Sequence, residues 1–512
     1  MNRIKNVSRN IFWGLFERII ALAVPFITRT VMIQTLGELY AGLNGLFTSV
    51  LQGLSLAELG IGSAITYSMY KPLAKGDIKE TCALLNLNKK LYRIIGLIIL
   101  GLGLCILPFL GNLIVGEIPT GVNIYILYIE YLSGIVLSYE LFSYRMSFVA
   151  AIQRNDIISR VQAIIDIVQL CFQLAALYIL GNYYVFILCG IICSLTNSVI
   201  VAVVIERLYP MYTSKGRVSS EVLLNIRQKV SGMLCQRIGS LVLQSVDMMV
   251  ISAFLGLKIL AVYQNYYYII TSLFGILSIL MNSMIATVGN SIVTESMEKN
   301  IHDFKTFNFI YIWVITFCTA CLLCMYQPFM KIWMGDSLML GNEIVLLFAV
   351  YFYVYKWCDM LFVYLEAFGA WWKTKLIPLA AAIVNLLTNI LLVQKIGLAG
   401  ILVSTIVSIL LVYNIGYAWV LFGKYFNAQK ELWRYAVKQL IYVAASGIAV
   451  GVTVFLCRFI TVDTMRRLFS VFFVCLVVPN LIYFLLFFRT EEFRDMKVLI
   501  KKVLESRSNG KE

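Results

Sequence analysis

The stretch ERIIALAVPFITR, residues 17–29, places charged side chains at both ends of an apolar run. It lies within a longer apolar segment, residues 10–36, and similar segments recur as far as residue 488. A bilayer core about 30 Å thick needs roughly 20 helical residues to cross it. The pattern therefore predicts repeated membrane-spanning helices. Charges inside them predict a function, because a charge at mid-span costs on the order of 2.5–3.5 kcal/mol.

The composition of the 512 residues agrees with a membrane protein. Hydrophobic residues make up 61% and charged residues only 13%, whereas soluble domains have roughly 45–50% and about 25%. The apolar runs are continuous rather than alternating, which excludes a β-barrel. The net charge of +15 could suggest nucleic-acid binding. The basic residues gather in loops on one side of the predicted spans, however, and we expect no nucleic-acid partner.

Fourteen spans are predicted, at residues 10–36, 42–69, 91–114, 122–146, 159–180, 184–205, 230–255, 260–288, 306–328, 343–368, 376–395, 399–422, 439–460 and 467–488. Basic residues on the sparsely charged side are Lys258, Lys331, Lys395, Arg458, Arg466 and Arg467. The positive-inside rule then places both termini in the cytoplasm. We expect a multi-pass protein of the bacterial cytoplasmic membrane. Its loops are too short to fold as soluble domains.

A repeated turn suggests how the spans are organised. Leu36-Gly37 joins the first two predicted spans, Leu255-Gly256 joins the seventh and eighth, and Ile396-Gly397 opens the twelfth. A repeat of six spans in the same orientation predicts two pseudo-symmetric six-helix lobes around a central cavity. The predicted domains are an N-terminal lobe (1–206), a cytoplasmic linker (207–229), a C-terminal lobe (230–425), two extra helices (426–490) and a basic cytoplasmic tail (491–512).

These motifs resemble those of a known group of transporters. Residues 36–43, LGELYAGL, follow the first span, and residues 59–64, LGIGSA, close the second. Asp247 precedes Leu255-Gly256, and Tyr263 follows. Over about residues 1–425 the chain resembles the MOP superfamily. Within it, the chain is similar to the polysaccharide-biosynthesis branch of Wzx-type O-antigen and capsule flippases, which are related to the MurJ and MATE families.

The resemblance implies a flippase and not an enzyme. Its cargo would be an undecaprenyl-pyrophosphate-linked oligosaccharide repeat unit, carried across the cytoplasmic membrane by alternating access for surface polysaccharide synthesis. A polysaccharide polymerase and export machinery are possible partners. No cofactor is expected, and no nucleotide-binding GxxxxGK[ST] motif is present. H⁺, Na⁺ or the membrane potential would then drive transport.

Charged residues of the first span are candidate cavity residues. Arg18 and Arg29 are 11 residues apart, so they share one helix face and lie about 16 Å apart along its axis. A guanidinium suits a pyrophosphate, because its planar fork donates two parallel hydrogen bonds. Glu17 is a candidate coupling residue or counterion. Snorkelling to the interface, or a structural ion pair, is the alternative for these residues.

Later spans add further candidates to these. The proposed substrate-binding residues are Arg18, Arg29, Arg237, Lys356, Gln169 and Gln244, and the proposed coupling or counterion residues are Glu17, Asp166, Asp247 and Asp359. Arg237 and Asp247 could instead form a buried lock between helices. Lys356 and Asp359, three residues apart, could simply neutralise each other. Gln162, Asp166, Gln169 and Gln173 form a stripe that suits either sugar hydroxyls or helix–helix contacts.

Other functions stay open at this point. A drug or cation exporter of the same fold would need cavity carboxylates to outnumber cations, and a lipid II flippase would differ only in substrate. A membrane polymerase is disfavoured, because no acid/base pair opens to water. Cys321 and Cys324 form a CxxC, but we interpret them as small buried hydrophobic residues and expect no metal site or disulfide.

Overall fold

The computed structural model describes residues 3–55, 61–141, 144–219, 245–460 and 464–509, together with positions 223 and 239. These residues are almost entirely helical. They form two compact units, Met1–Gln264 and Asn265–Glu512, and the boundary between the units falls within helix α10 (Leu257–Thr294). The predicted domain boundaries stay a prediction.

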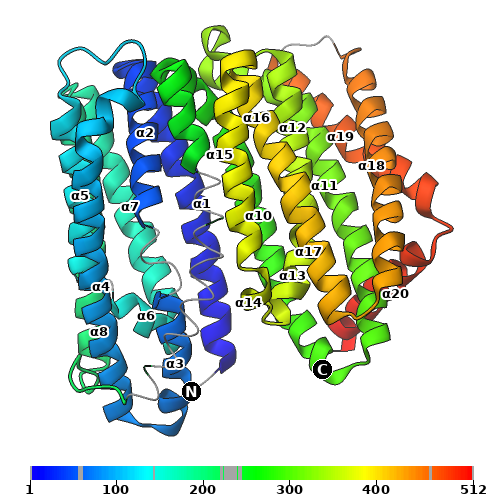
Figure 1. Ribbon diagram of the computed structural model, residues 1–512, viewed down its shortest axis with the longest axis horizontal. Coiled ribbons are helices and arrows are strands. Elements are labelled where there is room, and N and C mark those ends of the chain that lie inside the picture. The colour runs from blue at the N-terminus through cyan, green and yellow to red at the C-terminus, as the bar shows by residue number, and fades with distance from the viewer. Residues whose placement is uncertain are drawn as a thin grey trace. The chain divides into compact units, whose positions relative to one another are not determined.

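Unit 1 is a bundle of helices (Figure 1). Its elements are α1 (Arg3–Thr35), α2 (Glu38–Leu54), α3 (Ile61–Lys75), α4 (Ile78–Ile106), η2 (Leu107–Leu113), α5 (Ile124–Glu140), α6 (Tyr144–Ala151), α7 (Asn155–Tyr178), α8 (Tyr183–Leu208), the short helix Ser245–Leu255 and the start of α10. The most extensive contacts join α1 to α7 and α7 to α8, while α4 packs on α5. The first predicted span therefore lies against the fifth, which carries the polar stripe.

Unit 2 contains the rest of α10 and the C-terminal helices. Its elements are α11 (Met297–Met334), η3 (Asp336–Leu338), α12 (Asn342–Trp357), α13 (Asp359–Ala367), α14 (Trp371–Thr374), α15 (Leu376–Ile396), α16 (Leu398–Ser408), η4 (Ile409–Asn414), α17 (Ile415–Val420), η5 (Leu421–Tyr425), α18 (Gln429–Cys457), α19 (Thr464–Phe487) and α20 (Glu491–Asn509). Helix α11 contacts α12, α18, α19 and α20. It is thus the helix around which the last two predicted spans assemble.

Ten helices among the described residues are long and apolar enough to cross a membrane, or eleven if the bent pair α5 and α6 counts as one span. An all-helical, multi-pass membrane architecture is therefore confirmed. Helices suit this environment because the bilayer core offers no water to backbone N–H and C=O groups. Of the seventh predicted span, 230–255, the structure describes only position 239 and the helix Ser245–Leu255. The count of fourteen, the two six-helix lobes and the cytoplasmic termini stay predictions.

Short connections end in polar side chains that cap the next helix. Asn123 accepts hydrogen bonds from two backbone N–H groups at the start of α5, and Asn182 does the same for α8. Asp77 caps α4, and Ser296 caps α11. Each cap supplies an acceptor to a helix N–H that has no partner within the helix. Because of these caps, a new helix can start within a few residues of the end of the previous one.

The repeated Leu-Gly turns are confirmed as tight turns that require glycine. Gly37, Gly256 and Gly397 have φ angles of 99°, 87° and 56°. Side chains with a Cβ rarely adopt these conformations, whereas glycine reaches them at no steric cost. The sequence pattern thus marks the places where one helix ends and the next begins.

Two of these turns lie side by side within unit 1. Lys258 Nζ is 2.6 Å from Glu38 Oε1, and the two residues follow Gly256 and Gly37 by two and one positions. At Gly42 a Cβ atom would lie only 2.1 Å from the carbonyl oxygen of Leu257. The backbones of α2 and α10 are therefore close enough to exclude any side chain at this position, as small residues allow in membrane helix pairs.

Candidate functional site

Arg29 lies in the last turns of α1 and contacts the start of α10. Its Nη2 donates to the carbonyl oxygen of Ala261 at 2.9 Å, and Nη1 and Nη2 each lie 3.2 Å from Gln264 Oε1. Both acceptors are uncharged. The Arg29 side chain is half-buried, whereas Gln264 is buried. A guanidinium held in this way keeps its charge without neutralisation by these two partners.

Hydroxyl and amide groups gather beside Arg29. Tyr183, at the start of α8, is within electrostatic range of the guanidinium. The hydroxyl groups of Tyr131 and Tyr183 are 3.1 Å apart, and Tyr131 also donates to the side-chain oxygen of Asn44 in α2. We call Arg29, Asn44, Tyr131, Tyr183 and Gln264 the Arg29 cluster. It combines one cation from α1 with neutral hydrogen-bonding groups from four other helices of unit 1.

Nearer the start of α1, a second polar group surrounds Asp166 of α7. Glu17 is within electrostatic range of both Asp166 and Arg18. Gln162 donates to Asp166 Oδ1 at 2.6 Å, and Asn197 of α8 donates to Gln162 at 2.8 Å. Arg18 Nε is buried, and no acceptor for it is found among the described residues. This Asp166 cluster thus brings two carboxylates and a guanidinium together, as the α1–α7 packing requires.

Of the other two glutamines of the stripe, Gln173 connects two helices and Gln169 contacts Gln173 within α7. Gln169 donates to Gln173 at 3.4 Å, and Gln173 donates at 3.4 Å to the backbone oxygen of Phe186 in α8. A Cβ at Gly190 would lie 3.2 Å from the Gln173 amide nitrogen, so glycine allows this close approach. For Gln173 the structure thus favours the helix–helix alternative. Gln169 is half-buried and remains a candidate for a ligand-facing role.

Lys356 and Asp359 form a buried pair where one helix ends and another begins. Lys356 Nζ is 2.9 Å from Asp359 Oδ2, and the side chains are 6% and 16% exposed. The Tyr311 hydroxyl donates to the same carboxylate oxygen at 2.5 Å, and Lys356 also lies 4.6 Å from the centre of the Phe274 ring. The alternative of mutual neutralisation therefore fits this pair.

Helix dipoles favour the same pair. The predicted span 343–368 is divided at Cys358, so Lys356 occupies the last turn of α12 and Asp359 the first turn of α13. A cation at a helix C-terminus and an anion at an N-terminus are both stabilised by the partial charges there. We call this buried ion pair a structural lock, because it holds two side chains together inside the protein. Since its charge is already paired, Lys356 is a weaker candidate for substrate binding than Arg29.

Three candidates belong to the seventh predicted span, which the structure describes only in part. Asp247 is buried, with 6% of its surface exposed, in the helix Ser245–Leu255. Arg237 and Gln244 lie outside the described residues. Whether Asp247 pairs with Arg237 or lies beside Gln244 stays a prediction.

Several residues in these clusters were not among the sequence-based candidates. Asn44, Tyr131, Tyr183 and Gln264 line the Arg29 cluster, and Tyr311 completes the Lys356 pair. Each is a polar residue inside an apolar helix, which is the signal that could have identified them. Their partners are far apart in the sequence, and helix periodicity within one span cannot bring them together.

The chain is similar in fold to solved transporters. The lipid II flippase MurJ, in an inward closed conformation, aligns with a TM-score of 0.67 at 14% identity, over 95% of this chain and 99% of that chain. An inward-facing multidrug resistance MATE family transporter of the MOP superfamily gives 0.62 at 13% identity, over 78% and 93%. A mutant of the Vibrio cholerae MATE transporter VcmN gives 0.57 at 13% identity, over 82% and 98%.

No family model and no curated protein sequence matches the chain. At the identities of the solved structures, the similarity establishes the fold, which is that of MOP-type transporters. The similarity extends over nearly all of the MurJ chain. The similarity does not assign a ligand to the two polar clusters of unit 1.

Proposed function

We propose that this chain is a MOP-type flippase for an anionic, polyprenyl-pyrophosphate-linked oligosaccharide. The observation that carries the proposal is the Arg29 guanidinium, which lies half-buried in a membrane helix and donates to the uncharged acceptors Gln264 and Ala261. A membrane cation is costly unless it has a use. Phosphate oxygens are better acceptors for guanidinium N–H groups than an amide or a carbonyl, because the bond is then charged on both sides.

The neighbours of Arg29 suit the sugar part of such a ligand. Tyr131, Tyr183 and Asn44 offer hydroxyl and amide groups that can exchange hydrogen bonds with sugar hydroxyls. Aromatic rings of Tyr40 and Tyr183, with centres 5.2 Å apart, add flat surfaces against which sugar rings pack. The isoprenoid tail would remain in lipid while the two lobes alternate in access. The cell compartment of this proposal is the bacterial cytoplasmic membrane.

The Asp166 cluster suits energy coupling. Glu17 and Asp166 come from two packed helices and lie within electrostatic range of each other. Two nearby carboxylates disfavour double ionisation, so the pair can take up H⁺ or Na⁺. Arg18 beside them can bind an anionic group or act as their counterion. Coupling to an ion gradient or to the membrane potential is therefore part of the proposal.

The same pair of carboxylates favours a second candidate, a drug or cation exporter. In that case Glu17 and Asp166 would bind the substrate, and Arg29 would be structural. A lipid II flippase is a variant of the first candidate with a different glycan. Interaction with a polysaccharide polymerase and export machinery belongs only to the first candidate.

Gene deletion with complementation tests the proposal. The gene is deleted in its host, surface polysaccharide and lipid-linked intermediates are measured, and wild type, Arg29→Gln and Lys395→Ala are reintroduced at matched membrane levels. Lys395 is an exposed residue at the end of α15 and serves as the control. We expect deletion to remove polysaccharide and accumulate intermediates, and only Arg29→Gln to fail to restore export.

Two outcomes would contradict the proposal. Normal surface polysaccharide after deletion would exclude the oligosaccharide substrate. A further variant, Asp166→Asn, is reintroduced in the same way. Full rescue by Arg29→Gln together with failure of Asp166→Asn would favour the cation exporter instead. Uptake of organic cations into proteoliposomes that hold the purified protein then tests that alternative directly.

A further inference from the structure

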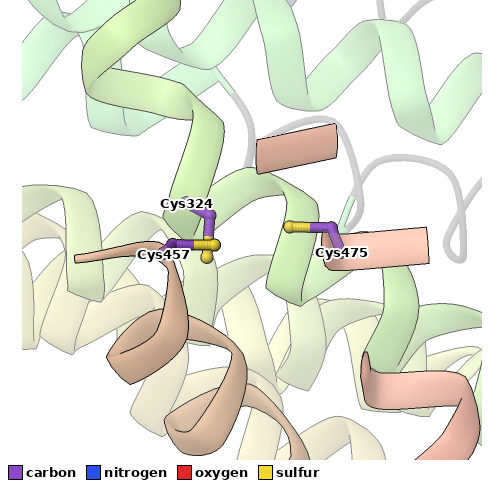
Figure 2. A group of neighbouring side chains, drawn as sticks. All are labelled: Cys324, Cys457 and Cys475. Atoms are coloured by element: carbon purple, nitrogen blue, oxygen red, sulfur yellow. The ribbon is translucent and has the colours of Figure 1, made fainter. Parts of the chain in front are cut away.

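Three helices of unit 2 bring cysteine sulfur atoms together. Cys324 lies in α11, Cys457 at the end of α18 and Cys475 in α19, and their Sγ atoms all lie within 4.8 Å of one another. Figure 2 shows the sulfur atoms of Cys324 and Cys457 side by side, with that of Cys475 directed toward them. Cys457 and Cys475 are buried, with 7% and 0% of their surfaces exposed.

A fourth thiol lies next to this group. Cys321 is one helical turn before Cys324 on α11, and its side chain packs against the buried cluster that contains Cys457 and Cys475. Cys321 and Cys324 are the CxxC motif noted in the sequence. The structure brings a second pair of cysteines, Cys457 and Cys475, next to this motif. Met325 packs against the same group and adds a thioether. Positions three apart on a helix are neighbours, so the CxxC can serve one centre.

Sulfur ligands from several segments are typical of structural zinc sites. Zinc takes four ligands in a tetrahedron with Zn–S distances of about 2.3 Å, which places sulfur atoms about 3.8 Å apart. The sulfur atoms of Cys324, Cys457 and Cys475 would need to approach one another by about 1 Å at most, and rotation of the Cys321 side chain would bring the fourth sulfur to them. Soft thiolate ligands select Zn²⁺ and Cu⁺ over Mg²⁺ or Ca²⁺. The geometry thus points to a thiophilic ion.

Charge balance separates Zn²⁺ from Cu⁺. Binding of Zn²⁺ by the four thiolates of Cys321, Cys324, Cys457 and Cys475 releases four protons and leaves two negative charges. Arg467 of α19 is within electrostatic range of Cys457 and can balance one of them. Cu⁺ on the same four thiolates would leave three negative charges, and burial of a net charge away from water is costly. Zn²⁺ therefore leaves the smaller net charge at this site.

We propose that Cys324, Cys457 and Cys475, with Cys321 as the fourth ligand, bind one structural Zn²⁺ that fastens α18 and α19 to α11. The two C-terminal spans contact α11 in the folded chain, and a metal bridge would add a strong link across these three helices. The ion has no place in the proposed transport step. The test of the zinc site therefore does not depend on whether the oligosaccharide is the substrate.

Metal analysis of the purified full chain tests this site. The protein in detergent is reduced with a phosphine, loaded with Zn²⁺ or with Cu⁺ in separate samples, freed of unbound ion by desalting and measured by mass spectrometry of the elements. Variants are Cys324→Ser, Cys457→Ser and Cys475→Ser, and the control is Cys193→Ser, a buried cysteine of α8. We expect about one Zn²⁺ per chain in wild type and control, and at least a tenfold loss in the three variants.

Measurements on the wild type keep the proposal testable if a variant fails to fold. Bound Zn²⁺ should protect the four thiols from maleimide labelling and raise the melting temperature, and Co²⁺ in its place should give a thiolate charge-transfer band. Retention of no Zn²⁺ by wild type, equal retention by all variants, or binding of Cu⁺ but not Zn²⁺ would overturn the proposal. So would a disulfide between these cysteines in protein isolated without reductant, because it would consume the ligands.

Discussion

Arg29 and Lys356 are both cations inside membrane helices, yet their surroundings differ. Arg29 is half-buried and donates to the uncharged acceptors Gln264 and Ala261, whereas Lys356 is buried against the Asp359 carboxylate. Lys356 also benefits from the end of α12, and Asp359 from the start of α13. The difference teaches that a charge in a span is a better candidate for ligand binding when the acceptors found for it are uncharged than when it lies against a carboxylate.

Loss of the Asp359 carboxylate should have the largest effect. Asp359→Asn leaves the buried Lys356 ammonium without a counterion, and removing one member of a buried pair costs on the order of 3–5 kcal/mol. We expect a marked fall in the melting temperature and in the amount of folded protein in the membrane. Thermal unfolding monitored by size-exclusion chromatography measures both. The double variant Lys356→Met with Asp359→Asn should recover most of the loss, and a lack of recovery would show that the pair is not a lock.

The second largest effect is expected when Arg29 is given a carboxylate partner, as Lys356 has. Gln264→Glu places a carboxylate where Arg29 now meets an amide, so a charge-assisted pair forms and competes with an anionic ligand. We expect export to fall about tenfold, with an unchanged or higher melting temperature. Accumulated lipid-linked intermediate is the measurement, and Gln327→Glu in α11 is the control. Normal export with Gln264→Glu would show that Arg29 does not meet the substrate.

A smaller effect is expected for Arg29→Lys. The charge stays, but the planar fork that binds two phosphate oxygens is lost, which reduces export by a few-fold to about tenfold. Stability should change little, since the acceptors Gln264 and Ala261 are neutral and can also accept from an ammonium group. Initial export rates at matched protein levels measure the change. Equal rates for Arg29→Lys and wild type would indicate that only the charge matters, while a loss equal to that of Arg29→Gln would show that the guanidinium shape is essential.

The exposed pair between the repeated turns should matter least. The Lys258 side chain is 65% exposed, and its contact with Glu38 is screened by salt. Glu38→Gln should therefore leave the melting temperature unchanged at physiological salt, in contrast to Asp359→Asn. A fall comparable to that of Asp359→Asn would mean that this pair, too, acts as a buried lock.

Much of the fold could be predicted from the helix periodicity and the glycine positions of the sequence. Continuous apolar runs fixed the helical class, and the Leu-Gly turns at Gly37, Gly256 and Gly397 are where the structure turns. Boundaries were less predictable. The span predicted at 343–368 corresponds to the candidate membrane span Asn342–Ala367, but its helix is interrupted at Cys358, which the sequence pattern did not indicate.

Sites were only partly predictable, because a sequence gives the face of one helix but not the helix that covers it. Arg18 and Asp166 were both candidates, and the packing of α1 on α7 brings the Glu17–Arg18 pair to Asp166. Gln264 was not a candidate, since its role depends on Arg29, 235 residues away. Cys321 and Cys324 looked isolated until α18 and α19 brought Cys457 and Cys475 beside them.

By itself, the sequence determined that this protein is built of membrane helices, where several of its tight turns fall and which polar side chains the membrane must accommodate. The physical reason is local: hydrophobicity, helix periodicity and the freedom of glycine act within a few residues. Only the tertiary structure decided which of those side chains lie against an opposite charge and which donate to uncharged acceptors. Arg29 contacts Gln264, and Cys324 lies beside Cys457, because helices distant in sequence pack together. Lys356 and Asp359 are near each other in sequence, but the packing of the surrounding helices buries their ion pair.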